Sequence, residues 1–378
     1  MTLRVGVVGC GNISDIYLSN AGRFKAINVV ACADLKEELA SAKAERYRIA
    51  PRSVEALIAS EDVDIVLNLT VPEAHATISL QAIAAGKHVF TEKPLATRFA
   101  DGEAVLKAAA QKGLEVGCAP DTVLGAALQT ARKLVDQGVI GRPIMGITAH
   151  LSHGMEDRHP NPAFFFRPGA GPVLDIGPYH ISSFIHLLGP VARVSALGQI
   201  GNETRTVSMP GSPHLGEIIP VEIMTSMQAL LQFESGAQVS FLASWDAWKS
   251  TVPSLELHGT DGSVGLPDID WFGGVVTLTR RNRPAETIET DAMSFGLPNH
   301  KAKAGPVANY RGLGLADMAH AIETGGPFRA SGAMGLHVLA VMEAITASAA
   351  ASGQSVEVKA SCARPEPLGE DLARALLK

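Results

Sequence analysis

Short apolar runs alternate with helix-length segments along the first third of the chain. The runs predicted to be strands are Leu3–Val8, Asn28–Ala33, Ile65–Leu69, His88–Phe90 and Leu114–Gly117. The segments predicted to be helices include Lys36–Arg48, Glu73–Ala85 and Phe99–Gln111. Strands that alternate with helices favour right-handed crossovers and a parallel sheet. Residues 1–120 are therefore predicted to form one doubly wound α/β domain.

The pattern changes after a predicted helix at Leu124–Gly138. Strand patterns then dominate, at Pro143–Leu151, Arg193–Gly198, Met227–Phe233, Gln238–Ala243, Ser254–His258 and Val275–Thr279. Partial alternation of polar and apolar positions is typical of an antiparallel sheet with one covered face. Helices predicted at Val173–Leu188, Gly314–Thr324 and Ala333–Ala351 would supply the cover. Residues 121–378 are therefore predicted to form an α+β domain with a large, mostly antiparallel sheet, whose last helices can pack back on the first domain.

Composition narrows the class of protein. The 378 residues suffice for two cores, and the net charge is -6 without a basic stripe, so no nucleic-acid partner is expected. No run of 18 apolar residues predicts a membrane span, and the first strand begins too early for a signal peptide. The four cysteines are scattered without a Cys-x-x-Cys pair, which indicates buried thiols and a cytoplasmic setting. Two segments, 202–220 and 292–309, fit no pattern, and whether they close over a site stays open.

A dinucleotide signature follows the first predicted strand. Gly9, Gly11, Asn12 and Ile13 belong to a G-C-G-N-I-S run that opens a helix, with serine where the usual fingerprint has its third glycine. The first glycine permits a tight turn, and the second lets the backbone approach a pyrophosphate at the helix N-terminus. Asp34 ends the next strand, where a carboxylate accepts hydrogen bonds from the adenosine ribose and repels a 2'-phosphate. The pattern favours NAD over NADP, and the alternative is a glycine turn with a capping aspartate.

The segment Phe90–Leu95 places Glu92, Lys93 and Pro94 where a buried strand should end. Ligands bind at the carboxyl ends of strands in open α/β sheets. A lysine there is a candidate for stabilising a substrate oxygen. The alternative is a solvated Glu–Lys pair that opens the next helix.

A second cluster, Asp175, Tyr179 and His180, lies around the start of a predicted helix in the other domain. Residues four apart share a helix face, whereas His180 would point away from that face. Pro178 is tolerated only in the first helical turn, which would leave Asp175 outside the helix. The alternative is that Asp175 caps the helix while Tyr179 and His180 pack in the core.

Together these motifs resemble the Gfo/Idh/MocA oxidoreductase family, named after glucose–fructose oxidoreductase and inositol dehydrogenase. The resemblance covers nearly the whole chain. Its matching segments are Glu92-Lys93-Pro94, Asp175-x-Gly-x-Tyr179, Thr70-Val-Pro72 with His75, Ala85-Gly-Lys-His-Val, and Gly138-Val-Ile-Gly141-Arg-Pro. It implies an N-terminal Rossmann domain and hydride transfer between a sugar-like alcohol and nicotinamide.

The resemblance also implies residue roles. Lys93 would polarise the reacting oxygen, and Asp175 would orient the substrate or hold Lys93. By similarity, the peptide bond between Lys93 and Pro94 would be cis. Tyr179 stands where inositol-dehydrogenase-like members carry histidine. We expect it to be the acid/base, its pKa lowered by the Lys93 ammonium, with His180 as the backup candidate. The positions expected to contact the cofactor, besides the glycine loop and Asp34, are Thr70, Pro72, His75, Glu92, Lys93 and Arg167.

The substrate pocket departs from the family pattern after the sixth strand, where relatives carry arginine or asparagine and this chain has Ala119-Pro120-Asp121. Asp121 is a candidate for accepting sugar hydroxyls, and its alternative is capping the 124–138 helix. His153 is a candidate for hydroxyl recognition, or part of a solvated loop. The histidines near it lack the spacing of a helical metal site, so no metal is expected. The aromatic run Phe164–Phe166 either walls the nicotinamide pocket or is core.

The sequence thus predicts an NAD-dependent dehydrogenase acting on a secondary hydroxyl of a sugar, cyclitol or glycoside. One rival keeps NAD bound and recycles it through oxidation-assisted elimination or internal redox exchange. Another is a non-catalytic sensor of NAD and sugar, because fold does not fix function. A homo-oligomer through the uncovered sheet face is expected.

Overall fold

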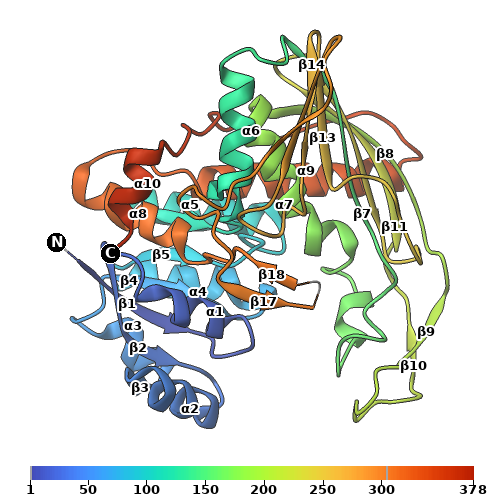
Figure 1. Ribbon diagram of the computed structural model, residues 1–378. Helices are drawn as coiled ribbons and strands as arrows, with labels where there is room; N and C mark the ends of the chain where they lie inside the picture. Colours follow the sequence, from blue (N-terminus) through green and yellow to red (C-terminus); the bar gives the residue numbers. More distant parts are fainter. Residues whose placement is uncertain (1, 304) are drawn as a thin grey trace.

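The computed structural model describes residues 2–303 and 305–378. Figure 1 shows a six-stranded sheet at lower left and a nine-stranded sheet at right, with helices α7 (Pro172–Leu188) and α9 (Gly332–Ala350) between them. Helix α9 contacts strands of both sheets, so the two layers share one continuous apolar core. This arrangement brings the carboxyl ends of the first sheet's strands against the start of α7.

The six-stranded sheet confirms the doubly wound prediction. Its strand order is β3-β2-β1-β4-β5-β6, and every pair is parallel. The strands are β1 (Leu3–Val8), β2 (Ile27–Ala33), β3 (Ala50–Arg52), β4 (Ile65–Asn68), β5 (His88–Thr91) and β6 (Val116–Cys118). The crossover helices are α1 (Ser14–Ala21), α2 (Glu37–Tyr47), α3 (Val54–Ala59), α4 (Pro72–Ala84) and α5 (Phe99–Lys112). The sequence pattern missed β3 and α3 because both are too short to show periodicity.

The nine-stranded sheet confirms the mostly antiparallel prediction. Its order is β16-β15-β14-β13-β7-β12-β11-β8-β19, and β12 pairs with β7 in parallel. The strands are β7 (Pro143–Leu151), β8 (Val191–Gln199), β11 (Ser226–Phe233), β12 (Gln238–Ser244), β13 (Leu255–Gly259), β14 (Gly262–Leu266), β15 (Val276–Arg280), β16 (Glu286–Ile288) and β19 (Val356–Glu357). Along β11 every second side chain is buried, as the alternation predicts.

In the part of the chain that the structure describes, helices pack on one face of this sheet and leave the other uncovered. Helices α7 and α9 pack on it, while Leu197 and Leu230 on the other face are 62% and 47% exposed. Helix α9 has the length and composition of a membrane span, yet most of it is buried, and core helices pass the same test. It also contacts α5 and β6, and α8 (Leu313–Thr324) contacts β6. The late helices therefore pack against the six-stranded sheet.

The two unassigned segments each contain a small hairpin. Strands β9 (Thr204–Thr206) and β10 (Ile218–Pro220) pair within the first, and β17 (His300–Ala302) and β18 (Gly305–Val307) within the second; residue 304 lies outside the described residues. The remaining elements are the short 3-10 turns η1 (Thr122–Leu124) and η2 (Ala163–Phe166) and the helices α6 (Ala126–Asp136) and α10 (Glu370–Leu376).

Candidate active site

The glycine loop between β1 and α1 has the geometry that a dinucleotide needs. Gly9 has a φ of 102°, and an added Cβ would lie 2.5 Å from the Leu69 carbonyl group, so only glycine fits this turn. At Gly11 an added Cβ would meet nothing within 4 Å, so open space lies in front of the loop. Asn12 and Ile13 are exposed in the same turn. The backbone N–H groups at the start of α1 are thus accessible to an anion.

The Asp34 carboxylate is held at the end of β2 by two backbone groups. Its Oδ2 accepts a hydrogen bond of 2.7 Å from the Cys10 N–H, and its Oδ1 accepts one of 2.9 Å from the Lys36 N–H. Carboxylate oxygens have further acceptor sites, which remain for ribose hydroxyls. Leu35 beside it is 93% exposed and offers no cation for a 2'-phosphate. The residues of the glycine loop and Asp34 therefore fit NAD.

The strand ends of β4 and β5 are tied together by His75. Its Nδ1 lies 2.7 Å from the Pro94 carbonyl oxygen and its Nε2 lies 3.1 Å from that of Thr70. The ring is fully buried, and burial lowers the pKa of His75. The expected cofactor contact of His75 therefore needs correction, because both ring nitrogens already face carbonyl groups inside the protein. The Lys93–Pro94 bond is cis, as predicted.

Glu92 is buried beneath the loop and faces the first helix. Its Oε1 accepts a 2.7 Å hydrogen bond from the Tyr17 hydroxyl, and its Oε2 accepts a 3.0 Å bond from the backbone N–H of Lys93. Tyr17 lies on α1, one turn after the glycine loop. The pair therefore couples the dinucleotide loop to the lysine. Tyr17 escaped the sequence reasoning because nothing marks a tyrosine on an amphipathic helix as different from core.

Lys93 and Asp175 meet across the two sheets. The Lys93 ammonium donates to the Asp175 backbone oxygen at 2.6 Å and to its Oδ1 at 2.9 Å. Helix α7 begins at Pro172, so Asp175 is inside it and Pro178 lies in its second turn, against expectation. Burial opposes the Lys93 charge most strongly, but Asp175, Tyr179 and Glu92 together more than offset it, and the pKa of Lys93 is raised.

Tyr179 lies one turn after Asp175, with its ring 5.3 Å from the Lys93 ammonium. The predicted meeting of lysine and phenol is therefore present. The pKa expectation was wrong in its net direction: burial and then Asp270 raise the pKa of Tyr179 to about 12, although Arg311 and Lys93 each act to lower it. A buried phenol loses the hydration of its anion, and this loss exceeds the attraction of the cations.

Two residues that the sequence reasoning missed adjoin Tyr179. The Arg311 guanidinium lies 3.4 Å from the Tyr179 hydroxyl and 2.6 Å from Asp270 Oδ1. The Asp270 side chain is 44% exposed, so it is open to a ligand. Both residues come from irregular segments far from any motif, and no sequence signal of this chain could have identified them.

A pocket opens beside Lys93. One wall is formed by Pro72, Lys93 and Pro94. The other wall comes from the segment before α7 and from its first turn: Phe164, Phe165, Gly169, Ala170, Gly171, Leu174 and Asp175. Phe164 is 44% exposed and Phe166 is fully buried, so the aromatic run is partly wall and partly core. Arg167 follows this run in an exposed position.

His180 does not join this group. Its Nδ1 contacts the Thr148 hydroxyl, and burial followed by the nearby His150 lowers the pKa of His180 to about 3. A ring that is buried, neutral and bonded to a strand cannot exchange protons with a substrate next to Lys93. The backup acid/base assignment is therefore corrected.

Asp121 also lies outside the pocket. Its side chain is buried, and one oxygen, Oδ2, accepts hydrogen bonds from the backbone N–H groups of Gly312 at 2.8 Å and Gly314 at 3.0 Å. Asp121 thus supports the start of α8 and makes no side-chain cap of its own turn. Burial raises its pKa to about 6. Direct contact with substrate is corrected to a structural role.

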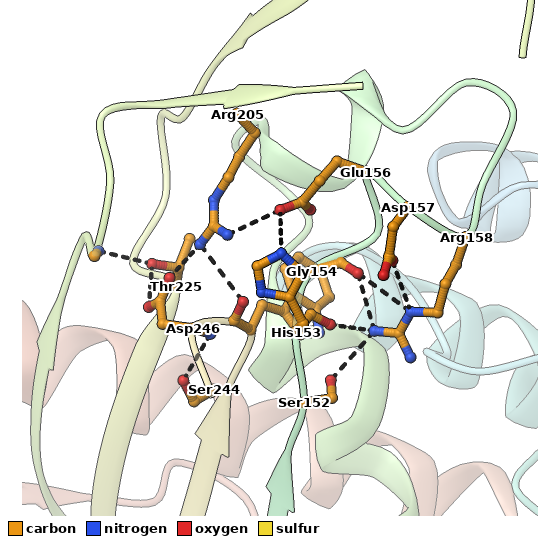
Figure 2. A network of polar contacts seen from close by, with 12 residues as sticks. Ser152, His153, Gly154, Glu156, Asp157, Arg158, Arg205, Thr225, Ser244 and Asp246 are labelled. Carbon is orange, nitrogen blue, oxygen red and sulfur yellow. Dashed lines mark hydrogen bonds and ion pairs between the residues drawn. The ribbon is translucent and has the colours of Figure 1, made fainter. Parts of the chain in front are cut away.

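His153 belongs to a network of ion pairs at the ends of β7 and β12 (Figure 2). Its Nε2 lies 3.3 Å from Glu156, whose carboxylate pairs with Arg205 at 2.9 Å, and Arg205 also contacts Asp246. The His153 ring also stacks on the Trp248 ring, with the ring centres 3.9 Å apart. These neighbours give no support to the predicted substrate contact. Within residues 2–303 and 305–378, no group of three or more His, Cys, Asp or Glu is arranged to hold a metal.

Comparisons with known proteins find relatives of both halves of the chain. Residues 3–119 match the model of the oxidoreductase family with an NAD-binding Rossmann fold, and residues 128–265 match that of the GFO/IDH/MocA C-terminal domain. A 1,5-anhydro-D-fructose reductase from Ensifer adhaerens is 28% identical over 94% of this chain and 98% of its own length. A dTDP-3,4-didehydro-2,6-dideoxy-alpha-D-glucose 3-reductase from Streptomyces violaceoruber is 32% identical over 70% of this chain and 72% of its own.

Solved structures share the fold over nearly the whole chain. An NAD-binding oxidoreductase from Klebsiella pneumoniae superposes with a TM-score of 0.81 at 23% identity, covering 95% of this chain and 99% of its own. The two family models together cover strands of both sheets. The glycine loop and the Glu92–Lys93–Pro94 segment lie within residues 3–119, which match the NAD-binding model. The chain therefore belongs to the Gfo/Idh/MocA family of NAD-binding oxidoreductases.

Proposed function

We propose that this protein is an NAD-dependent dehydrogenase acting on a secondary hydroxyl of a sugar, cyclitol or glycoside. The observation that carries the proposal is the ion pair of Lys93 and Asp175 in the wall of one pocket, with the Tyr179 ring 5.3 Å from the same ammonium. An ammonium and a phenol that converge next to a dinucleotide fold suit removal of a proton and a hydride from one carbinol. The names of two curated relatives, both sugar reductases, support the substrate class.

The cofactor would rest on Gly9 and Gly11, with its adenosine ribose at Asp34. When bound, NAD supplies the hydride acceptor. We assign further contacts to the neighbouring strand ends, at Thr70, Pro72, Glu92 and Lys93, and to the exposed Arg167. The carboxylate at Asp34 makes NADP the less favoured cofactor, because a 2'-phosphate would meet like charge there.

The catalytic side chains divide the reaction between them. Lys93 donates a hydrogen bond to the reacting oxygen and stabilises the charge that develops on it. Asp175 holds the ammonium in place and accepts from a neighbouring hydroxyl of the substrate. Tyr179 in its phenolate form takes the hydroxyl proton in oxidation, and as the neutral phenol it returns the proton in reduction.

We further propose the organisation of the molecule. Residues 1–120 form the NAD-binding domain, and residues 121–378 form the domain that binds substrate and assembles the oligomer. The uncovered face of the nine-stranded sheet, which carries Leu197 and Leu230, is the surface for a second copy. The four free cysteines suit a reducing cytoplasm.

A panel of polyols, cyclitols and glycosides, followed by NADH absorbance, tests the activity. The proposal expects NADH to accumulate with at least one of them and Tyr179→Phe to lose most of that rate. Turnover without added NAD would favour the rival in which bound NAD is recycled. NAD binding without reduction by any compound would favour the sensor.

A further inference from the structure

Arg311 is a buried cation held on several sides. Its guanidinium donates to Asn309 Oδ1 at 3.0 Å and to Asp270 Oδ1 at 2.6 Å, and it lies 5.7 Å from the centre of the Trp271 ring. The Asn309 backbone is itself fixed, since its oxygen accepts from Asn20 of α1 at 2.9 Å. The guanidinium therefore has one position, and an arginine stays charged at any pH that the fold survives.

This fixed charge faces the phenol. An N–H of Arg311 points at the Tyr179 hydroxyl at 3.4 Å, and the same nitrogen pairs with Asp270. The other charged groups around the phenol are Lys93, 5.3 Å from its ring, and Glu92. Asp175 lies one turn earlier on the same helix. Tyr179 is thus surrounded by charges of both signs, which act on its protonation in opposite directions.

Such a balance makes the phenol sensitive to each neighbour. Burial and Asp270 favour the protonated phenol, whereas Arg311 and Lys93 favour the phenolate. Lys93 also pairs with Asp175 and, in the proposed reaction, donates to the reacting oxygen, so its charge acts mainly on those two groups. Arg311 and Asp270 pair with each other at 2.6 Å, and the same Arg311 nitrogen faces the phenol, so this pair acts on the state of the phenol directly.

We infer that Arg311 and Asp270 are a pair of positioning residues that set the protonation of Tyr179, the guanidinium favouring phenolate and the carboxylate opposing it. The inference rests on the proposed acid/base role of Tyr179. In oxidation the hydroxyl proton passes to the phenolate oxygen, so the O–H bond of the substrate breaks as that of Tyr179 forms. Arg311 then donates to the phenolate before this transfer and to the neutral hydroxyl after it.

The two partners predict shifts of opposite sign. Without Asp270, no carboxylate next to Arg311 counters its charge, and the pKa of Tyr179 falls. Without Arg311, burial and Asp270 are opposed by Lys93 alone, and the pKa of Tyr179 rises. Charges at 4 to 6 Å move a pKa by roughly one unit or more. A purely structural role for the pair predicts lost stability and no opposite movement.

Fluorine NMR of protein labelled with 3-fluorotyrosine measures this directly. The chain has four tyrosines, so Tyr179→Phe assigns the Tyr179 resonance by its loss, and the fluorine brings phenol titration to lower pH. Asp270→Asn is expected to move that titration down by about one unit, Arg311→Gln to move it up, and Arg311→Lys to restore it nearly to the wild-type position. The matched control is Arg329→Gln. It breaks a buried ion pair between Arg329 and Asp317, whose atoms are 2.5 Å apart and which lies away from Tyr179, and it is expected to leave the titration unchanged.

Equal titration of Tyr179 in the wild type and Asp270→Asn would overturn the inference, and so would movement in the same direction in both Asp270→Asn and Arg311→Gln. If Arg311→Gln does not fold, Asp270→Asn and Arg311→Lys still decide the matter. Activity is a separate readout: full turnover by Tyr179→Phe overturns the proposed role of the phenol, even where the titration shifts as expected.

Discussion

Lys93 Nζ lies 2.6 Å from the backbone oxygen and 2.9 Å from the side-chain Oδ1 of Asp175, although 82 residues separate the two. The lysine lies two residues after a strand of the first sheet, and the aspartate lies in the first turns of a helix that covers the second. Both acceptors come from one residue, so the ammonium is positioned in two directions. Assembly of the site therefore depends on the docking of the two sheets and not on either alone.

Replacement of this lysine separates chemistry from cofactor binding. Lys93→Met is expected to lower kcat by roughly 100-fold or more, because it removes the donor to the reacting oxygen. NADH affinity, measured by protein fluorescence quenching, should fall far less than kcat, since Gly9, Gly11 and Asp34 remain and Lys93 is one cofactor contact among several. A loss of NADH binding equal to the loss of turnover would leave Lys93 as a cofactor contact alone.

Asp175→Asn tests the electrostatic half of the same contact. The carboxylate is the leading group that raises the pKa of Lys93, so its removal lowers that pKa. The wild type keeps Lys93 charged throughout neutral and mildly alkaline pH, whereas the variant is expected to lose activity as pH rises into the alkaline range. The kcat profile between pH 6 and about 10 measures this limb. Parallel profiles for the two proteins would contradict the assignment.

Cofactor choice is expected to depend on Asp34. Asp34→Ser removes the repulsion of a 2'-phosphate and the strong acceptor for the ribose. We expect NAD affinity to fall by about 10-fold and NADP affinity to rise, as a charged hydrogen bond contributes about 1.5 kcal/mol or more. Isothermal titration with both cofactors gives the ratio. Glu115→Gln, on the connection before β6, serves as a surface control, and an unchanged NAD/NADP ratio in Asp34→Ser would refute the expectation.

Local pattern predicted most of the fold. Strand β1 was predicted with its observed bounds, since Leu3–Val8 is an apolar run followed at once by glycine. The alternation in β11 likewise indicated one covered face. The helix at Pro172 was misjudged, because a proline rule drawn from isolated helices ignores packing that holds Pro178 inside one. The two hairpins in segments 202–220 and 292–309 were missed because their strands have three residues each.

Site residues that belong to a local sequence motif were predicted. Site residues that are brought together only by tertiary contacts were missed. Lys93, Asp175 and Tyr179 stand in recognisable local contexts. Asp270 and Arg311 do not, since their importance comes from folding two irregular segments over one phenol. Asp121 illustrates the converse error: a carboxylate after a strand end suggested ligand binding, and its partners proved to be backbone groups nearly 200 residues later.

The buried Asp121 predicts a pH dependence of stability. Its folded pKa of about 6 lies above the ordinary value of 3.8, so the folded protein binds more protons than the unfolded chain between these values. Its contribution to stability therefore falls as pH rises from 4 to 6. Asp121→Asn keeps one acceptor oxygen without the charge, so its Tm relative to the wild type should rise over this interval and then stay level. Asp121→Ala, which leaves both N–H groups unpaired, should lose about 1 to 3 kcal/mol. A constant gap between wild type and Asp121→Asn would disprove the linkage.

The exposed face of the nine-stranded sheet predicts self-association. Leu197 and Leu230 lie on neighbouring strands and line one shallow depression on this face. Light scattering after size exclusion should give a multiple of the 39.6 kDa chain mass, and Leu197→Asp should shift it towards a single chain. A wild-type mass of one chain would remove the proposed assembly. The matched control is Leu35→Asp. Leu35 is also a leucine and is more exposed, but it lies just after a strand of the other sheet.

His153 offers the sharpest separation between a structural and a substrate-binding residue. Its ring is stacked on Trp248, which is 82% exposed, and its Nε2 faces a glutamate that already pairs with Arg205. His153→Phe keeps a ring for the stack and leaves the Glu156–Arg205 pair intact. The variant should therefore retain kcat/KM within about twofold and lose little stability. Arg205→Ala, in contrast, leaves the buried Glu156 and the half-buried Asp246 without their cation and should cost about 3 kcal/mol in urea unfolding. A large rise in KM for His153→Phe with unchanged stability would return His153 to the substrate pocket, because only a contact with the ligand would be lost while the network around Arg205 persisted.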